Sequence, residues 1–509
     1  MKIVSAEQQY NADKITIEKQ QITSLELMER AGGQIFEWLD SRLEGVPVPV
    51  HIFCGIGDNG GDGMVVGRLL IEHGYNVVIY VVNYSDKRSD NFLYNYDRIK
   101  KVTKNWPIII KREAHFPKIT SEDVVIDAIF GIGLSRSPEG WVKKLITYLN
   151  ETEAFKLSID IPSGLFANKA LEDEDAVFLA NHTLTFQAPK LAFFLPKTAP
   201  FVRDFEVLDI GLDSDFLDDL KPLAHLITLF EAKNLYKYRD KYAHKGTFGH
   251  ALIVGGSYGK IGAAVLASKA AFKIGAGLVT AFVPKCGYNI LQTTIPEAMV
   301  ATDKEDEIIT NIVIDFEPTA IGIGMGIGKN KATAEAITKL FKTQNAPMVI
   351  DADALNILAE NKEVLKLLPK SSILTPHPGE LKRLIGAWKD DYEKLEKVKK
   401  FSKKNEAVVI IKGAFTTIVY MDNLYINSTG NPGMATGGSG DALTGAITGL
   451  LCQGYNILQA SLFGVYLHGL AGDNAANVIG YEALMASDII DNLGKAYMEL
   501  FTNDMEEPE

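Results

Sequence analysis

The stretch VPVHIFCG at residues 48–55 decides the fold of the first half of the chain. It is a nearly continuous apolar run that ends in glycine, and a helical pattern at 61–74 and a second apolar run at 76–82 follow it. Apolar runs that alternate with helices are typical of a parallel sheet covered by helices on both faces. Because the pattern recurs at 123–131, 155–164 and 182–186, it predicts a doubly wound α/β domain.

A second series of the same kind begins after the acidic, proline-containing stretch 211–223. We interpret that stretch as the approach to a boundary between an N-terminal domain at residues 1–222 and a C-terminal domain at 223–509. The second domain is predicted to contain strands at 250–256, 278–284, 319–328, 347–353, 371–380 and 407–413, and a long helix after 437–441. The predicted fold class is therefore α/β in both domains.

The composition and net charge argue against several classes of function. The 509 residues carry a net charge of −12, which argues against partners such as nucleic acid or an anionic membrane surface, because both need phosphate neutralisation. The three cysteines are widely spaced and form no CxxC pair, so neither a disulfide scaffold nor a zinc ribbon is expected. The polar start MKIVSAEQQYNADK and the absence of an apolar run of about 18 residues predict a soluble, cytoplasmic protein with no membrane partner.

The nine residues GIGDNGGDG at 55–63 form the first candidate site. They lie between a predicted strand and a predicted helix, where glycines allow a close approach of the backbone to a ligand. The spacing differs from the dinucleotide fingerprint, and no carboxylate ends the next strand. Asn59 and the two carboxylates suit a cation or hydroxyl groups better than a pyrophosphate; the alternative is a tight turn with no ligand.

Two further predicted strands end in Ile-Asp, at Asp127 and Asp160. Ligands of open parallel sheets bind at the carboxyl ends of strands, so these carboxylates are expected near the first glycine cluster. Asn59, Asp127 and Ser163 are candidate oxygen ligands for a hard cation, with K⁺, Na⁺, Mg²⁺ and Ca²⁺ all open. The alternative is that both aspartates cap the turns that follow them.

The stronger indication of a ligand-binding site is the segment Thr436-Gly437-Gly438-Ser439-Gly440-Asp441. It runs directly into a predicted helix, whose first backbone N–H groups could bind an anion. Asp441 could then act as a general base beside that anion, which is what phosphoryl transfer to a hydroxyl needs. No GxxxxGK[ST] motif occurs, so a P-loop is excluded. The alternative is a helix N-cap without catalytic function.

Two other strand ends carry candidate groups. Lys412 and the residues Gly413, Ala414, Phe415 and Thr416 could face a nucleotide, although a lysine at a strand end is often only solvated. His377 lies between two prolines that fix its backbone. His468, within an apolar helical pattern, is interpreted as a core residue.

Together these motifs resemble, in order and over nearly all of residues 1–500, the bifunctional NAD(P)H-hydrate repair enzymes. In that family an NAD(P)HX epimerase domain, Rossmann-like and three-layered, is fused to a ribokinase-like, ADP-dependent (S)-NAD(P)H-hydrate dehydratase domain. The resemblance rests on the elements GxGxNGGDG, VDAIFGIG (IDAIFGIG in this sequence), IDIPSG, TPHPGEL, KGAxT and NxGxATGGSGDxLxG.

The resemblance implies a role for each matching residue. In the epimerase domain the hydrated nucleotide would contact Asp58, Asn59, Gly60, Gly61, Asp62, Gly131, Ile132, Gly133, Leu134, Ser135, Arg136, Ser137 and Asp160. Asp160 is the candidate proton-transfer group, and K⁺ would be bound by Asn59, Asp127 and Ser163. In the dehydratase domain the hydrate would contact Ala263, Gly326, His377 and Asp441, and ADP with Mg²⁺ would lie against Lys412, Gly413, Ala414, Phe415, Thr416, Gly438, Ser439 and Gly440.

The implied reaction is metabolite repair. The substrates would be hydrated NADH and NADPH, the co-substrate ADP, and the assembly a homo-oligomer. Two positions depart from the family pattern: Asp58 stands where a second Asn is frequent, and Met325 stands where Pro is usual. Two other functions stay open at this point: a kinase for a vitamin precursor or a sugar with an accessory domain, and a non-catalytic nucleotide sensor.

Overall fold

The computed structural model describes residues 1–172 and 175–502. The chain divides into two compact units, an N-terminal unit at Lys2–Ala224 and a C-terminal unit formed by Met1 and His225–Glu509. Each unit is an α/β domain, so the predicted fold class is confirmed. No helix in the described ranges combines the length and the apolar character that a membrane span requires.

The N-terminal unit is built on a seven-stranded sheet in which every neighbouring pair is parallel, with the order β4-β3-β2-β5-β6-β7-β8. The strands are β2 (Val50–Cys54), β3 (Val77–Val82), β4 (Ile108–Ile110), β5 (Val124–Ala128), β6 (Phe155–Ile159), β7 (His182–Phe186) and β8 (Asp204–Leu208). The five predicted strands are all present. Strands β4 and β8, at the two edges of the sheet, were not predicted.

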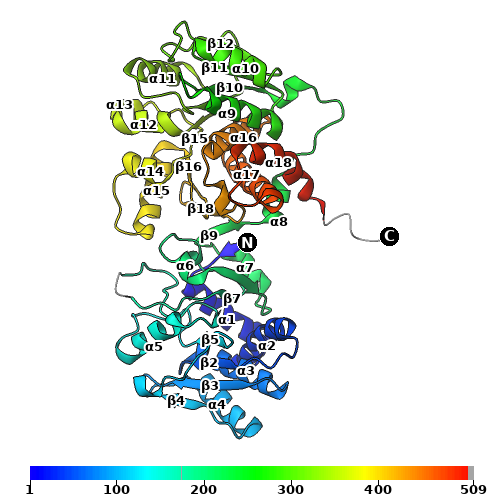
Figure 1. The fold of residues 1–509 in the computed structure, drawn as a ribbon, viewed down its shortest axis with the longest axis vertical. Coiled ribbons are helices and arrows are strands. Elements are labelled where there is room, and N and C mark those ends of the chain that lie inside the picture. The colour runs from blue at the N-terminus through cyan, green and yellow to red at the C-terminus, as the bar shows by residue number, and fades with distance from the viewer. Residues whose placement is uncertain (173–174, 503–509) are drawn as a thin grey trace. The chain divides into compact units, whose positions relative to one another are not determined.

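Helices cover both faces of this sheet (Figure 1). Alternate residues of β2 show it, because Ile52 and Cys54 pack in one core with the helices α1 to α4, whereas Phe53 packs in another with α5. The helices are α1 (Ala6–Gln20), α2 (Ser24–Leu43), α3 (Asp58–Glu72), α4 (Asp90–Val102) and α5 (Gly140–Glu151). The unit is therefore the expected three-layer arrangement.

One predicted boundary is wrong in a way that concerns the site. The helix expected from residue 61 begins at Asp58, so Asp58, Asn59 and Gly60 lie within its first turn rather than in a loop. A Cβ at Gly60 would lie only 2.0 Å from the carbonyl oxygen of Gly55. Part of the glycine content thus serves to pack α3 closely against the end of β2.

The C-terminal unit contains a mixed sheet with the order β9-β18-β17-β16-β15-β14-β13-β10-β11-β12. The pairs β16–β17 and β17–β18 are antiparallel and the other pairs of this series are parallel. The strands are β9 (Ala224–Ile227), β10 (His250–Val254), β11 (Leu278–Val283), β12 (Met299–Thr302), β13 (Ala320–Ile323), β14 (Met348–Ile350), β15 (Ser372–Leu374), β16 (Val408–Ile411), β17 (Thr417–Tyr420) and β18 (Asn423–Asn427). The six predicted strands are present.

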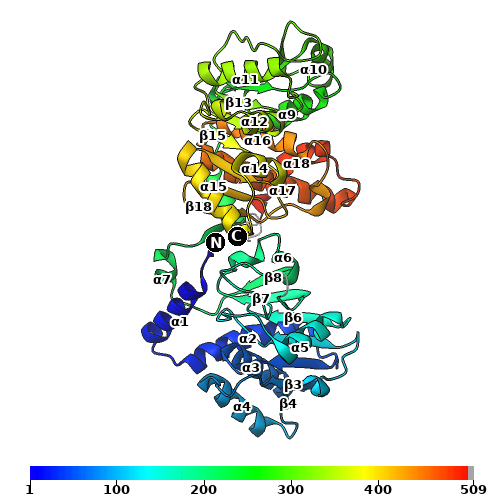
Figure 2. The same ribbon diagram turned by 90° about the vertical axis from the view of Figure 1, so that its left-hand side faces the viewer.

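Helices also cover both faces of this sheet. Ala251 and Ile253 of β10 pack with α9 (Ile261–Ile274), α16 (Ser439–Cys452), α17 (Ile457–Ile479) and α18 (Ala486–Glu499), whereas Leu252 and Val254 pack with α11 (Lys331–Thr343) and α12 (Ala352–Glu360). Figure 2 shows α9 and α16 side by side at the level of the sheet. The long helix predicted after 437–441 is present as α16, and α17 follows it.

The remaining elements are short or peripheral. They are β1 (Lys2–Ile3), α6 (Ala199–Val202), α7 (Ser214–Asp219), α8 (Leu229–Leu235), α10 (Tyr288–Thr294), α13 (Lys362–Leu365), α14 (Pro378–Ile385) and α15 (Asp391–Asn405).

Candidate active sites

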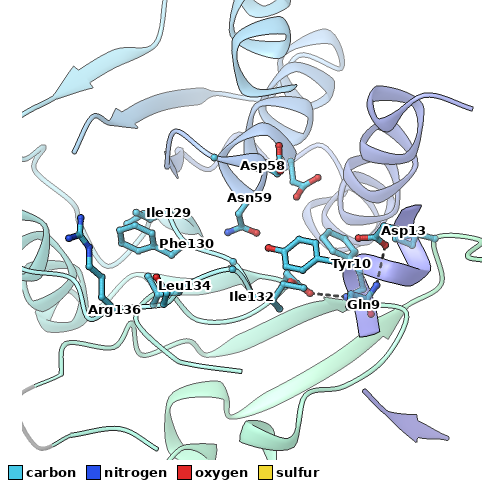
Figure 3. A pocket seen from close by; sticks show the side chains of 18 of the residues that line it. Gln9, Tyr10, Asp13, Asp58, Asn59, Ile129, Phe130, Ile132, Leu134 and Arg136 are labelled. Carbon is cyan, nitrogen blue, oxygen red and sulfur yellow. Dashed lines mark hydrogen bonds between the residues drawn. The ribbon is translucent and has the colours of Figure 1, made fainter. Parts of the chain in front are cut away.

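A cavity of about 460 Å³ lies in the N-terminal unit at the carboxyl ends of the strands. Its walls come from α1, from the first turn of α3, from residues 129–136 after β5, and from Asp160, Phe186 and Ile210. Figure 3 shows Tyr10 and Asp13 on the α1 side and Arg136 toward the other end. Among the described lining residues, Arg136 is the basic one and the acidic ones are Asp13, Asp58, Asp62 and Asp160.

Asp160 follows β6 and is held by an ion pair. Lys190, itself buried, places its Nζ 2.5 Å from Asp160 Oδ1 and 2.5 Å from Thr185 Oγ1. The same Asp160 oxygen accepts hydrogen bonds from Thr185 Oγ1 and from the backbone N–H of Phe186, both at 3.3 Å. Asp160 has a φ of 65°, a left-handed conformation that non-glycine residues seldom adopt. The Lys190 ammonium and two further donors thus surround this carboxylate oxygen.

Within residues 1–172 and 175–502, Asp13 and Asp62 have no paired cation of this kind. Burial, followed by the charge of Asp160, raises the pKa of Asp13 to about 6. Burial raises the pKa of Asp62 well above its usual value, and Asp160 and Asp58 add to that effect. Burial and then Asp160 also raise the pKa of the Tyr10 hydroxyl. The cavity thus combines an ion-paired carboxylate with carboxyl groups that hold their protons more tightly than in water.

The three candidate cation ligands lie together beside this cavity, but protein donors already occupy Asp127. Its two oxygens accept hydrogen bonds from the Ser163 hydroxyl (2.6 Å), from the Ser163 N–H (2.7 Å), and from Ile129 N–H and Ser158 Oγ (both 3.2 Å). A carboxylate offers about four acceptor positions, so these donors use them all. The buried Nδ2 of Asn59 has no hydrogen-bond partner. Asn59 is therefore the member of this group with unused hydrogen-bonding capacity.

The structure brings most of the predicted hydrate-binding residues of this unit to the cavity. Asp58, Asn59, Asp62, Asp160 and residues 131–136 line it. Ser137 lies outside the lining, and its hydroxyl donates to Asp175. Gln9, Tyr10 and Asp13 of α1, as well as Lys190, were not predicted from the sequence.

The first turn of α16 forms the candidate site of the C-terminal unit. Its N-cap is Gly438, with a φ of 91° and no side-chain capping hydrogen bond. The first N–H groups of a helix have no partner within the helix, so this end can receive an anion. His468 of α17 is buried, as predicted, and its Nε2 lies 3.0 Å from the carbonyl oxygen of Ser439. It thus holds the first turn of α16 in place.

A buried carboxylate, Asp351, lies beneath this turn at the end of β14. Its Oδ1 is 2.8 Å from Lys412 Nζ and its Oδ2 accepts a hydrogen bond of 3.0 Å from Thr444 of α16. Burial, followed by the negative charge of Asp351, raises the pKa of the nearby Asp441 carboxyl to about 6, and Lys412 opposes the rise. Asp441 is thus poised to take a proton at neutral pH.

The remaining predicted residues lie at neighbouring strand ends. The Lys412 N–H donates to the carbonyl of Pro376, which joins the ends of β16 and β15 and brings the His377 loop beside Lys412. His377 accepts at Nδ1 from the Gly379 N–H, and its Nε2 lies 3.5 Å from the buried Glu380. A Cβ at Gly326 would lie 3.2 Å from the Cβ of Ala263, so these two also adjoin.

Met325 does not disturb the glycines around it. Gly324 and Gly326 have φ values of 122° and 61°, and Met325 itself is fully buried. Asp351 was not predicted as a site residue. It follows Ile350 at the end of an apolar strand, just as Asp127 and Asp160 follow isoleucines. The same Ile-Asp pattern could therefore have predicted it.

Two family models match the chain. The model described as YjeF-related protein N-terminus matches residues 24–192, and the model described as NAD(P)H-hydrate dehydratase matches residues 251–495. The two matches fall in the N-terminal and the C-terminal unit respectively.

Relatives match over almost the whole chain. The bifunctional NAD(P)H-hydrate repair enzyme Nnr of Moorella thermoacetica is 35% identical, covering 97% of this chain and 96% of its own length. The protein of the same name from Escherichia coli is 32% identical, covering 93% and 89%. Among solved structures, an ADP/ATP-dependent NAD(P)H-hydrate dehydratase from Bacillus subtilis is 30% identical and covers 54% of this chain and 99% of its own, with a TM-score of 0.48. The chain belongs to the family of bifunctional NAD(P)H-hydrate repair enzymes.

Proposed function

We propose that this chain repairs hydrated NADH and NADPH, with epimerase activity in residues 1–222 and ADP-dependent dehydratase activity in residues 223–509. The observation that carries the proposal is the position of Asp441 in the first turn of α16, beside the Lys412–Asp351 ion pair. It provides a base and an anion-binding helix end at one place. Membership of the repair-enzyme family supports the assignment of both activities.

In the dehydratase, the hydrate carries a hydroxyl group that is a poor leaving group. Asp441 takes the hydroxyl proton while the oxygen attacks the terminal phosphorus of ADP, and AMP leaves. The N–H groups at Gly438, Ser439 and Gly440 stabilise the transferring phosphoryl group. Orthophosphate then leaves with the C6–O electron pair, a proton leaves C5, and NAD(P)H is restored.

The nucleotide would lie against Lys412, Gly413, Ala414, Phe415 and Thr416, and the hydrate against Ala263, Gly326, His377 and Asp441. Within the described residues no group of three or more His, Cys, Asp or Glu side chains is arranged to hold a metal ion. This fits Mg²⁺ that arrives with the diphosphate, because Mg²⁺ is usually bound by substrate phosphates, waters and one or two carboxylates. It would neutralise charge on the diphosphate.

In the epimerase, the hydrated ring would lie in the 460 Å³ cavity beside Asp160. Asp58–Asp62 and Gly131–Ser137 would hold the nucleotide, with Arg136 available to its phosphates. The oxygen donors of Asn59, Asp127 and Ser163 suit K⁺, which would supply positive charge beside an acidic cavity. Direct binding of K⁺ by Asp127 requires that the Ser163 hydroxyl give up its hydrogen bond to that carboxylate.

The test is an assay of the purified full chain with a mixture of the two hydrate epimers, Mg²⁺, and either ADP or ATP. The expected result is the return of reduced-nicotinamide absorbance with one orthophosphate per NAD(P)H, and consumption of both epimers. The absence of both reduced-nicotinamide absorbance and orthophosphate would contradict the proposal. A stable phosphate ester in place of orthophosphate would identify a small-molecule kinase instead.

An Asp441→Asn variant separates catalysis from binding. It keeps the size of the side chain and removes the base, so dehydration should fall by at least about 100-fold while ADP still binds, as measured by calorimetry. Dehydration at the wild-type rate would remove Asp441 from its proposed role. The proposed homo-oligomer is tested on the same preparations by light scattering after size-exclusion chromatography.

A further inference from the structure

The acidic cavity of the N-terminal unit contains a second carboxyl group whose surroundings differ from those of Asp160. Asp13 lies on α1 and lines the same cavity (Figure 3). Gln9 Nε2, one helical turn earlier, donates a long hydrogen bond of 3.4 Å to Asp13 Oδ1. Asp160, by contrast, has the Lys190 ammonium at 2.5 Å and two further donors. One cavity thus holds an ion-paired carboxylate and a carboxyl group without a paired cation.

We propose that Asp13 is a second catalytic residue of the epimerase and that it acts as the general acid while Asp160 acts as the general base. This inference rests on the proposed epimerase function. When two titratable groups in one site lie in surroundings that favour opposite protonation states, they are suited to opposite roles in proton transfer. Asp160 is paired with the Lys190 ammonium, whereas Asp13 is partly buried with no paired cation among the described residues, and its surroundings favour its protonated form.

The hydroxyl of the hydrate lies on C6, the carbon bonded to the ring nitrogen N1, so C6 can be inverted by opening the ring. Asp160 takes the hydroxyl proton and the C6–O bond becomes a carbonyl. The C6–N1 bond breaks, its electron pair goes to N1, and Asp13 gives its proton to N1. Rotation of the aldehyde and the reverse of each transfer close the ring as the other epimer. Both carboxyl groups then regain their starting states, so no co-reactant is needed.

The charges around Asp13 support this assignment. Burial and the charge of Asp160 raise its pKa to about 6, the more distant Asp58 raises it slightly, and Gln9 and Lys190 oppose the rise. Tyr10, on the same helix, reaches the opposite loop, because a Cβ at Gly133 would lie 2.5 Å from its hydroxyl. Among the described residues, the charged and titratable groups around Asp13 are Asp160, Lys190, Asp58, Asp62 and Tyr10.

The experiment uses the full chain without ADP, so that the dehydratase is idle, and follows the conversion of one purified epimer by chromatography against an enzyme-free control. Asp13→Asn should lower the epimerisation rate by at least about 100-fold, with little change in the affinity for the hydrate. The fall in wild-type kcat/KM as pH rises through about 6 should be absent in this variant. Asp13→Glu should recover part of the rate and restore that pH dependence.

Glu18→Gln is the matched control, because Glu18 is an exposed carboxylate on the same helix. It should epimerise at the wild-type rate. An Asp13→Asn variant within about threefold of wild type, or one in which rate and hydrate affinity fall together and Asp13→Glu rescues neither, would overturn the inference. Wild-type protein that fails to epimerise at all would instead overturn the proposed function.

Discussion

Lys412 Nζ lies 2.8 Å from Asp351 Oδ1, although the two residues are 61 positions apart in the sequence. Asp351 is almost fully buried, and its other oxygen is bound to Thr444 of α16. One carboxylate therefore fixes both a lysine proposed to face the nucleotide and the helix that carries Asp441. It also places a negative charge near Asp441, which is one reason why the pKa of Asp441 is raised.

Asp351→Asn should change the pH dependence of dehydration. Removal of a like charge lowers the pKa of Asp441 from about 6, and Lys412, freed of its partner, lowers it further. If Asp441 acts as the proposed base, activity is lost as pH falls through its pKa, so the acid limb of kcat/KM should move to lower pH by about one unit. The affinity for ADP should fall about tenfold, since Lys412 loses the negative charge of the partner that orients it.

The measurement is a pH–rate profile of NAD(P)H release by the variant and by wild type. Epimerisation by the same variant protein is the internal control and should be unchanged. An acid limb at the wild-type position would contradict the influence of Asp351 on Asp441.

Lys190→Met should damage the epimerase unit in two ways. Removal of one partner from a buried ion pair leaves the other charge uncompensated, so the free energy of unfolding of this unit should fall by about 3 kcal/mol. Epimerisation should fall at least about tenfold because Asp160 loses its partner. Urea titration followed by residual epimerase activity measures both effects. Lys118→Met is the control, because Lys118 is exposed; a stability loss of the same size there would refute the argument.

Two glycine-to-alanine changes should act in opposite directions. A Cβ at Gly445 would lie 2.0 Å from the carbonyl oxygen of Ala267, so α16 would have to move away from α9. Gly445→Ala should cost about 3 kcal/mol and lower dehydration with it. At Gly494, an exposed position within α18, nothing lies within 4 Å, so Gly494→Ala should stabilise the helix by about 1 kcal/mol. Thermal unfolding monitored by circular dichroism compares the two, and equal effects would refute the packing argument.

His468 should make the C-terminal unit sensitive to acid. Burial lowers its pKa from 6.5 to about 4, so between these values the unfolded chain binds a proton that the folded chain does not. The free energy of unfolding of this unit therefore falls as pH drops below 6.5, by about 2 kcal/mol between pH 7 and pH 5. His468→Gln should flatten this part of the stability curve in urea titrations. His244→Gln, at an exposed histidine, should leave it unchanged.

The sequence allowed the interior of both sheets to be predicted, because a strand buried on both faces is a local apolar run that ends in a turn. The edge strand β8 and the hairpin β17–β18 were missed, since they are half-buried or alternate apolar with polar residues. The antiparallel pairs were missed for the same reason. Their pairing is decided by neighbours in the sheet rather than by their own composition.

The site residues were predictable only where they lie next to one another in a sequence motif. Asp441 and the glycines before it follow one another in the sequence, so their proximity needs no fold. Nothing in the sequence around Lys190 marks it as a site residue. Only the fold, through β7 and the turn after it, brings Lys190 to Asp160, which lies 30 residues earlier in the chain. Asp13 is one polar residue in a polar helix, and nothing local distinguishes it from Glu18. Both become meaningful only through contacts between distant segments.

The left-handed backbone of Asp160 limits which amino acids can occupy that position. Asn and Gly tolerate a φ of 65° about as readily as Asp, whereas a β-branched residue there would strain the chain. An Asp-to-Asn change is therefore the route by which a lineage could lose the proposed proton transfer at this position while the polypeptide still folds. Asparagine at this position in a descendant sequence would mark a pseudoenzyme domain, whereas valine or isoleucine would indicate that the turn itself had been rebuilt.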